Sequence, residues 1–189
     1  MSLVTPSTKP FRLDLDGSYF ISDITPADHP AFLEHLKEKQ IHDQTAAIPF
    51  PYTAADADWW INHTAEVTKE QGRSVIWAIR RADGYLIGSI GYHDFTLGKS
   101  HKAEIGYWLA KPYWNQGIIT KAVQKATDLA FREFGLIRVT AHVFDFNGGS
   151  ARVLEKCGYQ LEGILRKHYQ KNGKIFDGKI YAKVLGTSS

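Results

Sequence analysis

The amino-acid sequence predicts a single α+β domain in which helices flank a mostly antiparallel sheet. A length of 189 residues corresponds to about one domain. Short apolar segments are separated by the turn pairs Asp16-Gly17, Asp83-Gly84 and Asn172-Gly173, which are typical of hairpins. One strand, one loop and one long amphipathic helix follow each other in the middle of the chain, and this order indicates a single crossover connection.

The first half of the chain predicts one hairpin and two helices. Residues 11–15 alternate with period two and meet the turn at Asp16-Gly17, as a strand entering a hairpin does. Thr25-Pro26 is a helix start, and Ala31, Phe32, His35 and Leu36 then recur at helical spacing. A second helix begins at Thr53 and ends at Gln71-Gly72, and residues 48–52 form a rigid aromatic loop between the two helices.

The second half of the chain predicts the rest of the sheet. Residues 75–79 and 85–90 form a hairpin, and residues 102–109 form the next strand. A long helix follows, closed by Gly135, with one apolar face made by Ile119, Ala122, Val123, Ala126, Leu129 and Ala130. A strand over 137–144, a short helix over 150–156 and a hairpin around Asn172-Gly173 complete the domain.

Composition limits the class of protein. Hydrophobic residues make up 43% of the chain and the net charge is only +3, which describes a folded protein without the basic stripe of a nucleic-acid binder. No segment reaches the ~20 apolar residues that span a bilayer, and no signal peptide is found. The single cysteine, Cys157, favours a reducing compartment and is expected to be a packing residue. We therefore expect a cytoplasmic domain over 10–186, with flexible tails over 1–9 and 187–189.

The segment 103–122 is a strand, a tight loop and a helix start. Unpaired N–H groups and the positive end of the helix dipole make such a helix start an anion site, and Gly117 would allow a phosphate to approach the backbone. One glycine before a helix is more often only a turn, so this pattern is weak by itself. Neither the Walker A spacing nor the Rossmann glycine spacing is present, which argues against an NTPase or a dehydrogenase.

The block from Asn147 to Arg166 reads Asn-x-x-Ser, a helix, Lys-x-Gly-aromatic and Glu-Gly-x-x-Arg. It resembles a signature of the GNAT superfamily of acetyltransferases, specifically its RimJ/RimL-like branch. The segment 103–122 resembles the acyl-CoA pyrophosphate loop of that family, and residues 48–61 resemble the entry into its second helix. The likeness runs from about Arg12 to Leu185. It implies a GNAT fold with coenzyme A bound at the splayed central strands.

Two departures from the family pattern affect the expected site. Trp114 stands at the first position of the pyrophosphate loop, Asn115 replaces a frequent glycine, and Ile119 replaces a small residue. Many members also carry a tyrosine general acid where this chain has Leu154. The rim of the phosphate site is therefore altered, and another proton donor is needed.

The resemblance implies acetyl-CoA as co-substrate, bound along the strand 105–109 with its pyrophosphate on the start of the helix that follows. The side chains of Tyr107 and Trp108 are expected to serve sheet packing, while their backbone groups bind the cofactor. Asn147 would bond the pantetheine arm, although Asn and Ser are also ordinary helix caps. The expected cofactor-binding residues are Tyr107, Trp108, Leu109, Gln116, Gly117, Ile118, Ile119, Thr120 and Asn147.

The proton chemistry of the expected reaction needs a base and an acid. Glu104 is the expected base; the alternative is an exposed carboxylate neutralised by Lys102 or Arg138. Ser150 is the expected acid, with water as the alternative. No metal is expected, because no histidine falls in a ligand spacing. The residues expected at the acceptor amine are Asp43, Phe50, Tyr52, Trp60, Tyr92, His93 and Tyr169.

The function implied is acetyl transfer from acetyl-CoA to a primary amine, of a protein N-terminus or of a small molecule, by direct attack in a ternary complex. The alternative is a catalytically silent acyl-CoA-binding or sensor module. No nucleic-acid or membrane partner is expected, and a monomer and a homodimer are both compatible with the sequence.

Overall fold

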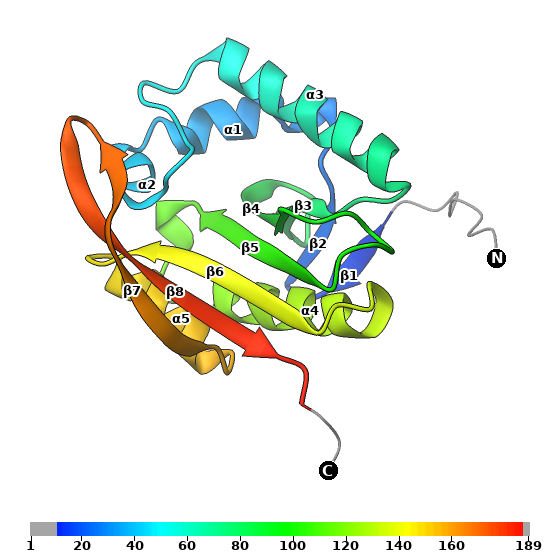
Figure 1. The fold of residues 1–189 in the computed structure, drawn as a ribbon. Coiled ribbons are helices and arrows are strands. Elements are labelled where there is room, and N and C mark those ends of the chain that lie inside the picture. The colour runs from blue at the N-terminus through cyan, green and yellow to red at the C-terminus, as the bar shows by residue number, and fades with distance from the viewer. Residues whose placement is uncertain (1–10, 187–189) are drawn as a thin grey trace.

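The computed structural model describes residues 11–186, so the tails expected over 1–9 and 187–189 lie outside the described residues. An eight-stranded sheet in the order β1-β2-β3-β4-β5-β6-β8-β7 forms the middle layer, with α1 and α3 on one face and α4 and α5 on the other (Figure 1). The strands are β1 (Arg12–Asp14), β2 (Tyr19–Asp23), β3 (Ile76–Arg81), β4 (Leu86–His93), β5 (Lys102–Leu109), β6 (Arg138–Phe144), β7 (Gln160–Lys171) and β8 (Lys174–Val184). The α-helices are α1 (His29–Leu36), α2 (Lys39–Gln44), α3 (Ala54–Gln71), α4 (Ile118–Glu133) and α5 (Gly148–Lys156). The α+β fold class is confirmed.

One pair of strands departs from the antiparallel pattern and opens the sheet. β5 and β6 are parallel and pair only over Lys102–Glu104 with Arg138–Thr140. Beyond that point β6 continues beside β8, so the β6-facing edge of residues 105–109 has no strand partner. The expected splay of the central strands is present, and it leaves backbone N–H and C=O groups available to a ligand.

The layer of α1, α2 and α3 follows the sequence pattern except at α2 and at the start of α1. The predicted helix start at Thr25-Pro26 is a 3-10 turn over Pro26–Asp28, and α1 begins at His29. Ala31, Phe32, His35 and Leu36 are all buried, as their spacing predicts. Thr53 caps α3 and forms a capping box with Asp56, and Gly72 ends the helix in a left-handed conformation. The six-residue α2 was not predicted, because a helix so short carries too few residues to show a periodic pattern.

The helix α4 begins one residue before the predicted apolar face. Ile118 is buried in the core cluster, whereas Ile119 is only partly buried against that cluster; both residues line a cavity. The other predicted face positions, Ala122, Val123, Ala126, Leu129 and Ala130, are buried. A shift of one residue rotates a helix by about 100°, so the helical period alone does not decide which of two adjacent isoleucines faces the sheet.

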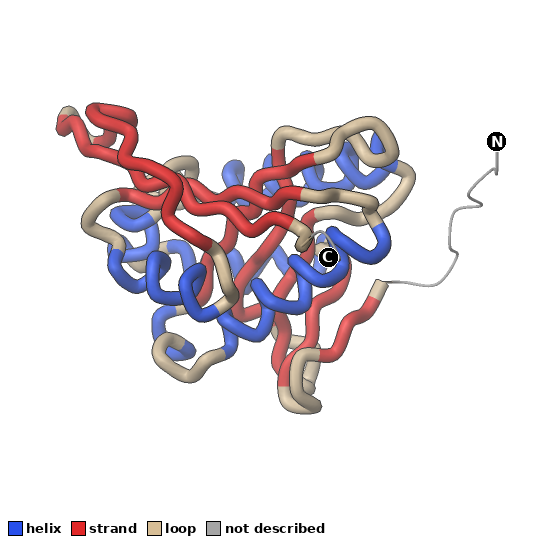
Figure 2. Tube along the Cα trace, turned by 60° about the horizontal axis from the view of Figure 1, so that its bottom comes forward, coloured by secondary structure: helices blue, strands red, loops and turns tan. Residues whose placement is uncertain are grey.

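The hairpin of β7 and β8 projects from one end of the molecule (Figure 2) and curves toward α2 (Figure 1). Lys171 near its tip donates hydrogen bonds to the carbonyl oxygens of His42 and Thr45. Asn172 Nδ2 lies 3.3 Å from His42 Nε2. The hairpin tip is thereby attached to the end of α2 and to the loop that follows it.

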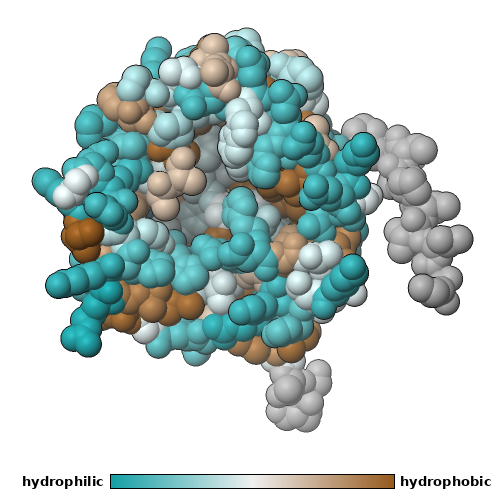
Figure 3. Space-filling model, turned by 45° about the horizontal axis from the view of Figure 1, so that its top comes forward, coloured by the Kyte–Doolittle hydropathy of each residue, from teal (hydrophilic) through white to brown (hydrophobic). Residues whose placement is uncertain are grey.

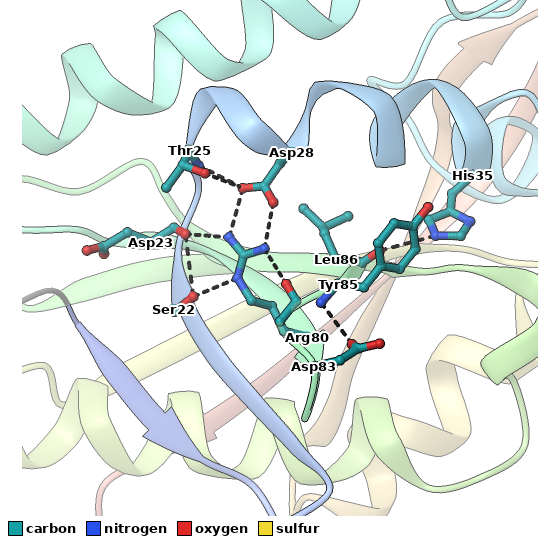
Figure 4. A network of polar contacts seen from close by, with 10 residues as sticks. Ser22, Asp23, Thr25, Asp28, His35, Arg80, Asp83, Tyr85 and Leu86 are labelled. Atoms are coloured by element: carbon teal, nitrogen blue, oxygen red, sulfur yellow. Dashed lines mark hydrogen bonds and ion pairs between the residues drawn. The ribbon is translucent and has the colours of Figure 1, made fainter.

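A buried ion pair attaches α1 to the sheet (Figure 4). The guanidinium of Arg80 on β3 lies 2.5 and 2.8 Å from the two carboxylate oxygens of Asp28, and both side chains are less than 10% exposed. Arg80 also donates to Ser22 Oγ and to the carbonyl oxygens of Asp23 and Gly84. All three nitrogens of the guanidinium are therefore engaged, which a buried charge requires.

Across residues 11–186, no helix combines the length and apolar character needed to cross a bilayer.

Candidate functional site

A cavity of about 820 Å³ lies where the sheet splays, and the space-filling view shows the face with α1 and α3 hollowed near its middle (Figure 3). The segment after α2, the first turns of α3 and α4, the strands β5 and β6 and the start of α5 line it. Of the residues predicted for the site, the lining includes Glu104, Ser150, Tyr107, Trp108, Leu109, Gly117, Ile118, Ile119, Asn147, Tyr52, Trp60, His93 and Tyr169.

The alternation of β5 divides this cavity between the two faces of the sheet. Trp108 packs in the cluster of α1 and α3, and Glu104 alternates in phase with it. Tyr107 packs against the other cluster, which contains α4 and α5. Because β5 and β6 separate beyond Glu104, the cavity is lined from both faces at once. The site therefore has one half beside α3 and another beside α4 and α5.

The start of α4 forms one wall of the second half. Gly117, the N-cap, has φ of +76°, and no side chain caps the helix. The uncapped first-turn N–H groups and the helix dipole suit an anionic group. Trp114 Nε1 donates a 2.6 Å hydrogen bond to the Leu109 carbonyl, and Gln116 Nε2 donates to the Pro112 carbonyl, so both side chains hold the loop that leads to Gly117.

Glu104 is paired with a residue that the sequence did not indicate. Its Oε2 lies 2.8 Å from Nδ1 of His142 on β6. Neither of the two predicted alternative partners, Lys102 and Arg138, forms an ion pair with Glu104. Arg138 is paired with Glu162 on β7. Glu104 is half-buried and lines the cavity, so its carboxylate stands beside the space where a ligand would lie.

Asn147 and Ser150 hold the start of α5 on the opposite side. Asn147 Oδ1 accepts from the Ser150 backbone N–H at 3.1 Å, which is the expected cap, and its Nδ2 donates to the Gln44 carbonyl at 3.2 Å. Asn147 therefore connects α5 to the end of α2. The Ser150 hydroxyl lies 2.8 Å from the hydroxyl of Tyr107. The expectation that the Tyr107 side chain serves packing alone is incomplete, because its hydroxyl meets a predicted catalytic group.

The half beside α3 is aromatic. Tyr52, Trp60, Tyr169 and His93 line it. Burial raises the pKa of the Tyr52 and Tyr169 hydroxyls, and it lowers the pKa of the His93 imidazole despite the nearby Glu104 carboxylate. Both tyrosines therefore stay protonated at neutral pH.

Five predicted residues are absent from the cavity lining. Asp43 is exposed on α2 and paired with Lys39 at 2.6 Å, and Phe50 is exposed with its ring against His42. The prediction of Tyr92 at the acceptor site is wrong. Its ring is buried among Trp77, Phe95 and Phe134 on the other face of β4. Gln116 and Thr120 flank the residues of the α4 start that do line the cavity.

Several lining residues were not predicted: Trp59, Asp56, His142, Arg152 and the segment 44–49. Trp59 is 63% exposed and stacks on His63, one turn further along α3. Trp59 lies on α3 with Asp56 and Trp60, and helical periodicity alone does not tell whether its side chain is exposed or packs in the core. Arg152 is the one Lys or Arg among the lining residues, and it lies on α5.

Cys157 is buried at the end of α5, and its thiol donates to the Thr120 carbonyl at 3.3 Å. Burial raises the pKa of this thiol, which keeps it protonated and unreactive. The expected packing role of Cys157 is confirmed.

A model of the GNAT acetyltransferase domain matches residues 20–160. The chain belongs to the GNAT acetyltransferase family. The match runs from Phe20 in β2 to Gln160, just past α5, so it includes the splayed strands, the start of α4 and the Asn147–Ser150 turn. This confirms the fold expected from the resemblance.

Relatives at the level of sequence include YoaA of Bacillus subtilis, an uncharacterized N-acetyltransferase, which is 38% identical over 116 residues, 61% of this chain and 65% of its own length. The ribosomal-protein-serine acetyltransferase of Escherichia coli is 31% identical over 117 residues, 61% of this chain and 64% of its own length. The matches thus span somewhat less than two thirds of these relatives. The solved structure of RimL, a ribosomal-protein α-N-acetyltransferase in complex with coenzyme A, superposes with a TM-score of 0.83 at 15% identity, covering 93% of this chain and 98% of that one.

Proposed function

We propose that this protein transfers the acetyl group of acetyl-CoA to a primary amine by direct attack in a ternary complex. The observation that carries the proposal is the cavity at the splay between β5 and β6, which has a carboxylate on one side and a hydroxyl on the other. The family membership supports acetyl-CoA as the co-substrate, and the RimL structure named above was determined with coenzyme A.

The half of the cavity beside α4 and α5 fits coenzyme A. The unpartnered edge of β5 over residues 105–109 can pair with the two amides of a pantetheine arm. The uncapped start of α4 at Gly117 to Ile119 suits a pyrophosphate, and Arg152 adds a positive charge in the lining. The Asn147 side chain would exchange its bond to Gln44 for one to the arm.

The half beside α3 fits an amine. Its lining combines the Glu104 carboxylate with aromatic rings from Tyr52, Trp60 and Tyr169, and it contains no Lys or Arg. Aromatic faces and a carboxylate attract a cationic group. An amine must lose its proton before it attacks, and Glu104 is proposed to accept that proton, directly or through water. His142 Nδ1, 2.8 Å from Glu104 Oε2, is placed to orient the carboxylate.

The Ser150 hydroxyl is proposed to act on the leaving group. As the C–N bond forms and the C–S bond breaks, negative charge develops on sulfur, and Ser150 donates its hydrogen there. A backbone N–H of β5 near Tyr107 or Trp108 would polarise the carbonyl oxygen of the acetyl group. Because polar groups stand on both sides of the cavity, an enzyme accounts for the site better than a silent acyl-CoA-binding module.

The acceptor class proposed is a protein N-terminus or a small-molecule amine. The name of the Escherichia coli relative supports the first. We propose a cytoplasmic location because the one cysteine is a buried free thiol, as a reducing compartment maintains it, and because ribosomal proteins are cytoplasmic substrates.

A thiol-release assay tests the proposal. Acetyl-CoA is supplied with panels of N-terminal peptides, aminoglycosides, polyamines and amino acids, and at least one panel should release coenzyme A. Glu104→Gln and Ser150→Ala should each lower kcat by about a hundredfold while the KM for acetyl-CoA changes little. Glu162→Gln is the matched control, because Glu162 is an exposed carboxylate that pairs with Arg138 outside the cavity lining. Binding of acetyl-CoA without release for any amine would favour the silent module.

A further inference from the structure

We infer that Tyr107 positions and polarises the hydroxyl of Ser150, so that two hydroxyl groups act in series on the leaving sulfur. The inference rests on the proposed function. It starts from the 2.8 Å contact between Tyr107 Oη and Ser150 Oγ, which joins the middle of β5 to the first turn of α5. Within residues 11–186, this tyrosine is the only hydrogen-bond partner of the serine hydroxyl.

The direction of this hydrogen bond follows from the acceptors available to each group. The Tyr107 hydroxyl can donate to Ser150 Oγ at 2.8 Å or to the Ser150 carbonyl at 3.5 Å, and the second distance is too long for a good O–H···O bond. In the arrangement we infer, Tyr107 donates to Ser150 Oγ, and the serine does not donate back.

When Tyr107 is the donor, the hydrogen of the Ser150 hydroxyl remains available to a group bound in the cavity. Each hydroxyl has one hydrogen and two acceptor positions, and Tyr107 occupies one acceptor position of Ser150. Ser150 is only partly buried and lines the cavity. Its hydrogen is thus free to point at an atom bound there, at the place where the resemblance puts the thiol of coenzyme A.

The same bond makes Ser150 a better donor. Burial raises the pKa of the Tyr107 hydroxyl, so the phenol keeps its proton and remains a donor throughout. When sulfur takes the hydrogen of Ser150, negative charge grows on Oγ, and a hydrogen bond to a charged oxygen is stronger than one to a neutral oxygen. The proton passes from Oγ to sulfur as the C–S bond breaks, and a water in the cavity returns a proton to Oγ. That water is reprotonated by the proton that Glu104 took from the amine, so the amine proton replaces the one transferred to sulfur.

Leu154 shows why such an arrangement is needed in this chain. Its side chain is fully buried in the core and carries no proton, at the position where many family members have a tyrosine. The phenol of this chain reaches the leaving group from β5 instead, through one serine. Tyr107 is a positioning residue in this scheme, because it acts through Ser150.

The test is a double-mutant cycle on kcat with an amine that the wild-type chain acetylates. Tyr107→Phe keeps the ring and should lower kcat about tenfold with the KM for acetyl-CoA within about twofold. In a Ser150→Ala background the same change should have no further effect. In a Ser150→Thr background, which restores a hydroxyl, the loss on Tyr107→Phe should return.

Tyr159→Phe is the matched control, because its hydroxyl makes a 2.7 Å hydrogen bond to buried Thr127 and lies outside the cavity lining. It should change stability without changing kcat. Thermal unfolding of each variant identifies a temperature at which all are folded, and the cycle is measured there. Equal losses on Tyr107→Phe with and without Ser150 would overturn the inference while leaving acetyl transfer intact. Absence of acetyl transfer by the wild-type chain would instead overturn the proposed function.

Discussion

At the residue scale, three histidines of this chain lie in three different chemical environments. His35 is 8% exposed and its Nε2 lies 3.1 Å from the Leu86 carbonyl. His142 contacts the Glu104 carboxylate, and His93 lines the aromatic half of the cavity. Sequence spacing distinguished none of them, because an imidazole is compatible with core, surface and catalytic positions alike.

His35 is expected to make the protein less stable in mild acid. Burial lowers the pKa of its imidazole in the folded state, so below about pH 6.5 the unfolded chain binds a proton that the folded chain does not. The free energy of unfolding therefore falls as the pH drops from about 6.5 toward the folded-state pKa, by at most about 1.4 kcal/mol per pH unit for one group. Urea unfolding at several pH values should show this slope.

His35→Gln should reduce that slope, because an amide does not titrate. His93, whose pKa is lowered too, contributes in the same sense, so only the part removed by His35→Gln belongs to His35. Replacement of the exposed His101 by Gln is the control and should leave the slope unchanged. An identical slope in the His35→Gln variant would refute the assignment.

At the element scale, the connection from β5 to α4 determines the cofactor half of the cavity. The strand leaves one edge free over residues 105–109, and the helix starts with a glycine in the left-handed conformation. Trp114, which departs from the family pattern, fixes the loop between them through the Leu109 carbonyl. The Trp114 side chain at the rim is therefore compatible with a helix start that lines the cavity.

Gly117→Ala is expected to weaken acetyl-CoA binding. An alanine with φ near +76° is strained by about 1–2 kcal/mol, and the helix start would relax away from the geometry that faces the cavity. The KM for acetyl-CoA should rise roughly tenfold, equivalent to about 1.4 kcal/mol. Steady-state kinetics and calorimetric titration with coenzyme A measure this change.

Gly72→Ala provides the matched comparison. Gly72 has φ of +75° at the end of α3, and an added methyl group would meet no atom within 4 Å, as at Gly117. The two variants should lose similar stability, while only Gly117→Ala should change the KM. A similar KM change in both would assign the effect to general destabilisation.

At the scale of the whole molecule, the cavity depends on contacts that attach α1 to the sheet and the β7–β8 hairpin to α2. The pair of Arg80 and Asp28 fixes α1 on the sheet from within the protein (Figure 4). At the other end, Lys171 attaches the β7–β8 hairpin to α2. The walls of the cavity therefore come from segments more than 100 residues apart in the chain, as the Asn147–Gln44 bond also shows.

Asp28→Ala should be strongly destabilising. It leaves the Arg80 guanidinium buried without its carboxylate, a change that costs about 3–5 kcal/mol. The double variant Asp28→Ala/Arg80→Met removes both charges and should recover part of that loss. Urea unfolding at pH 7 gives the free energies, with Glu162→Gln as the exposed comparison, for which a change within about 1 kcal/mol is expected. A loss under 1 kcal/mol for Asp28→Ala would contradict this role of the pair.

The sequence by itself determined the order of the strands and of the helices other than α2, the bounds of β5 and the start of α3, because these depend on local chemistry. Alternation, turn pairs and a capping box act over a few residues and are visible in the chain. The motifs also located the half of the cavity that we propose binds acetyl-CoA, since Gly117, Asn147 and Ser150 each stand at a helix start. The short α2 escaped because it lacks a periodic pattern.

Only the tertiary structure decided which neighbour each functional group meets. Tyr92 and His93 are adjacent, and a strand turns one of them to each face, yet the sequence does not say which face holds the cavity. The partner of Glu104 depended on the register of the parallel pair β5–β6, which brought His142 to 2.8 Å. Tyr107 and Ser150, 43 residues apart, met because α5 packs back on the sheet. Local patterns encode local geometry, whereas contacts between distant segments depend on how the layers pack.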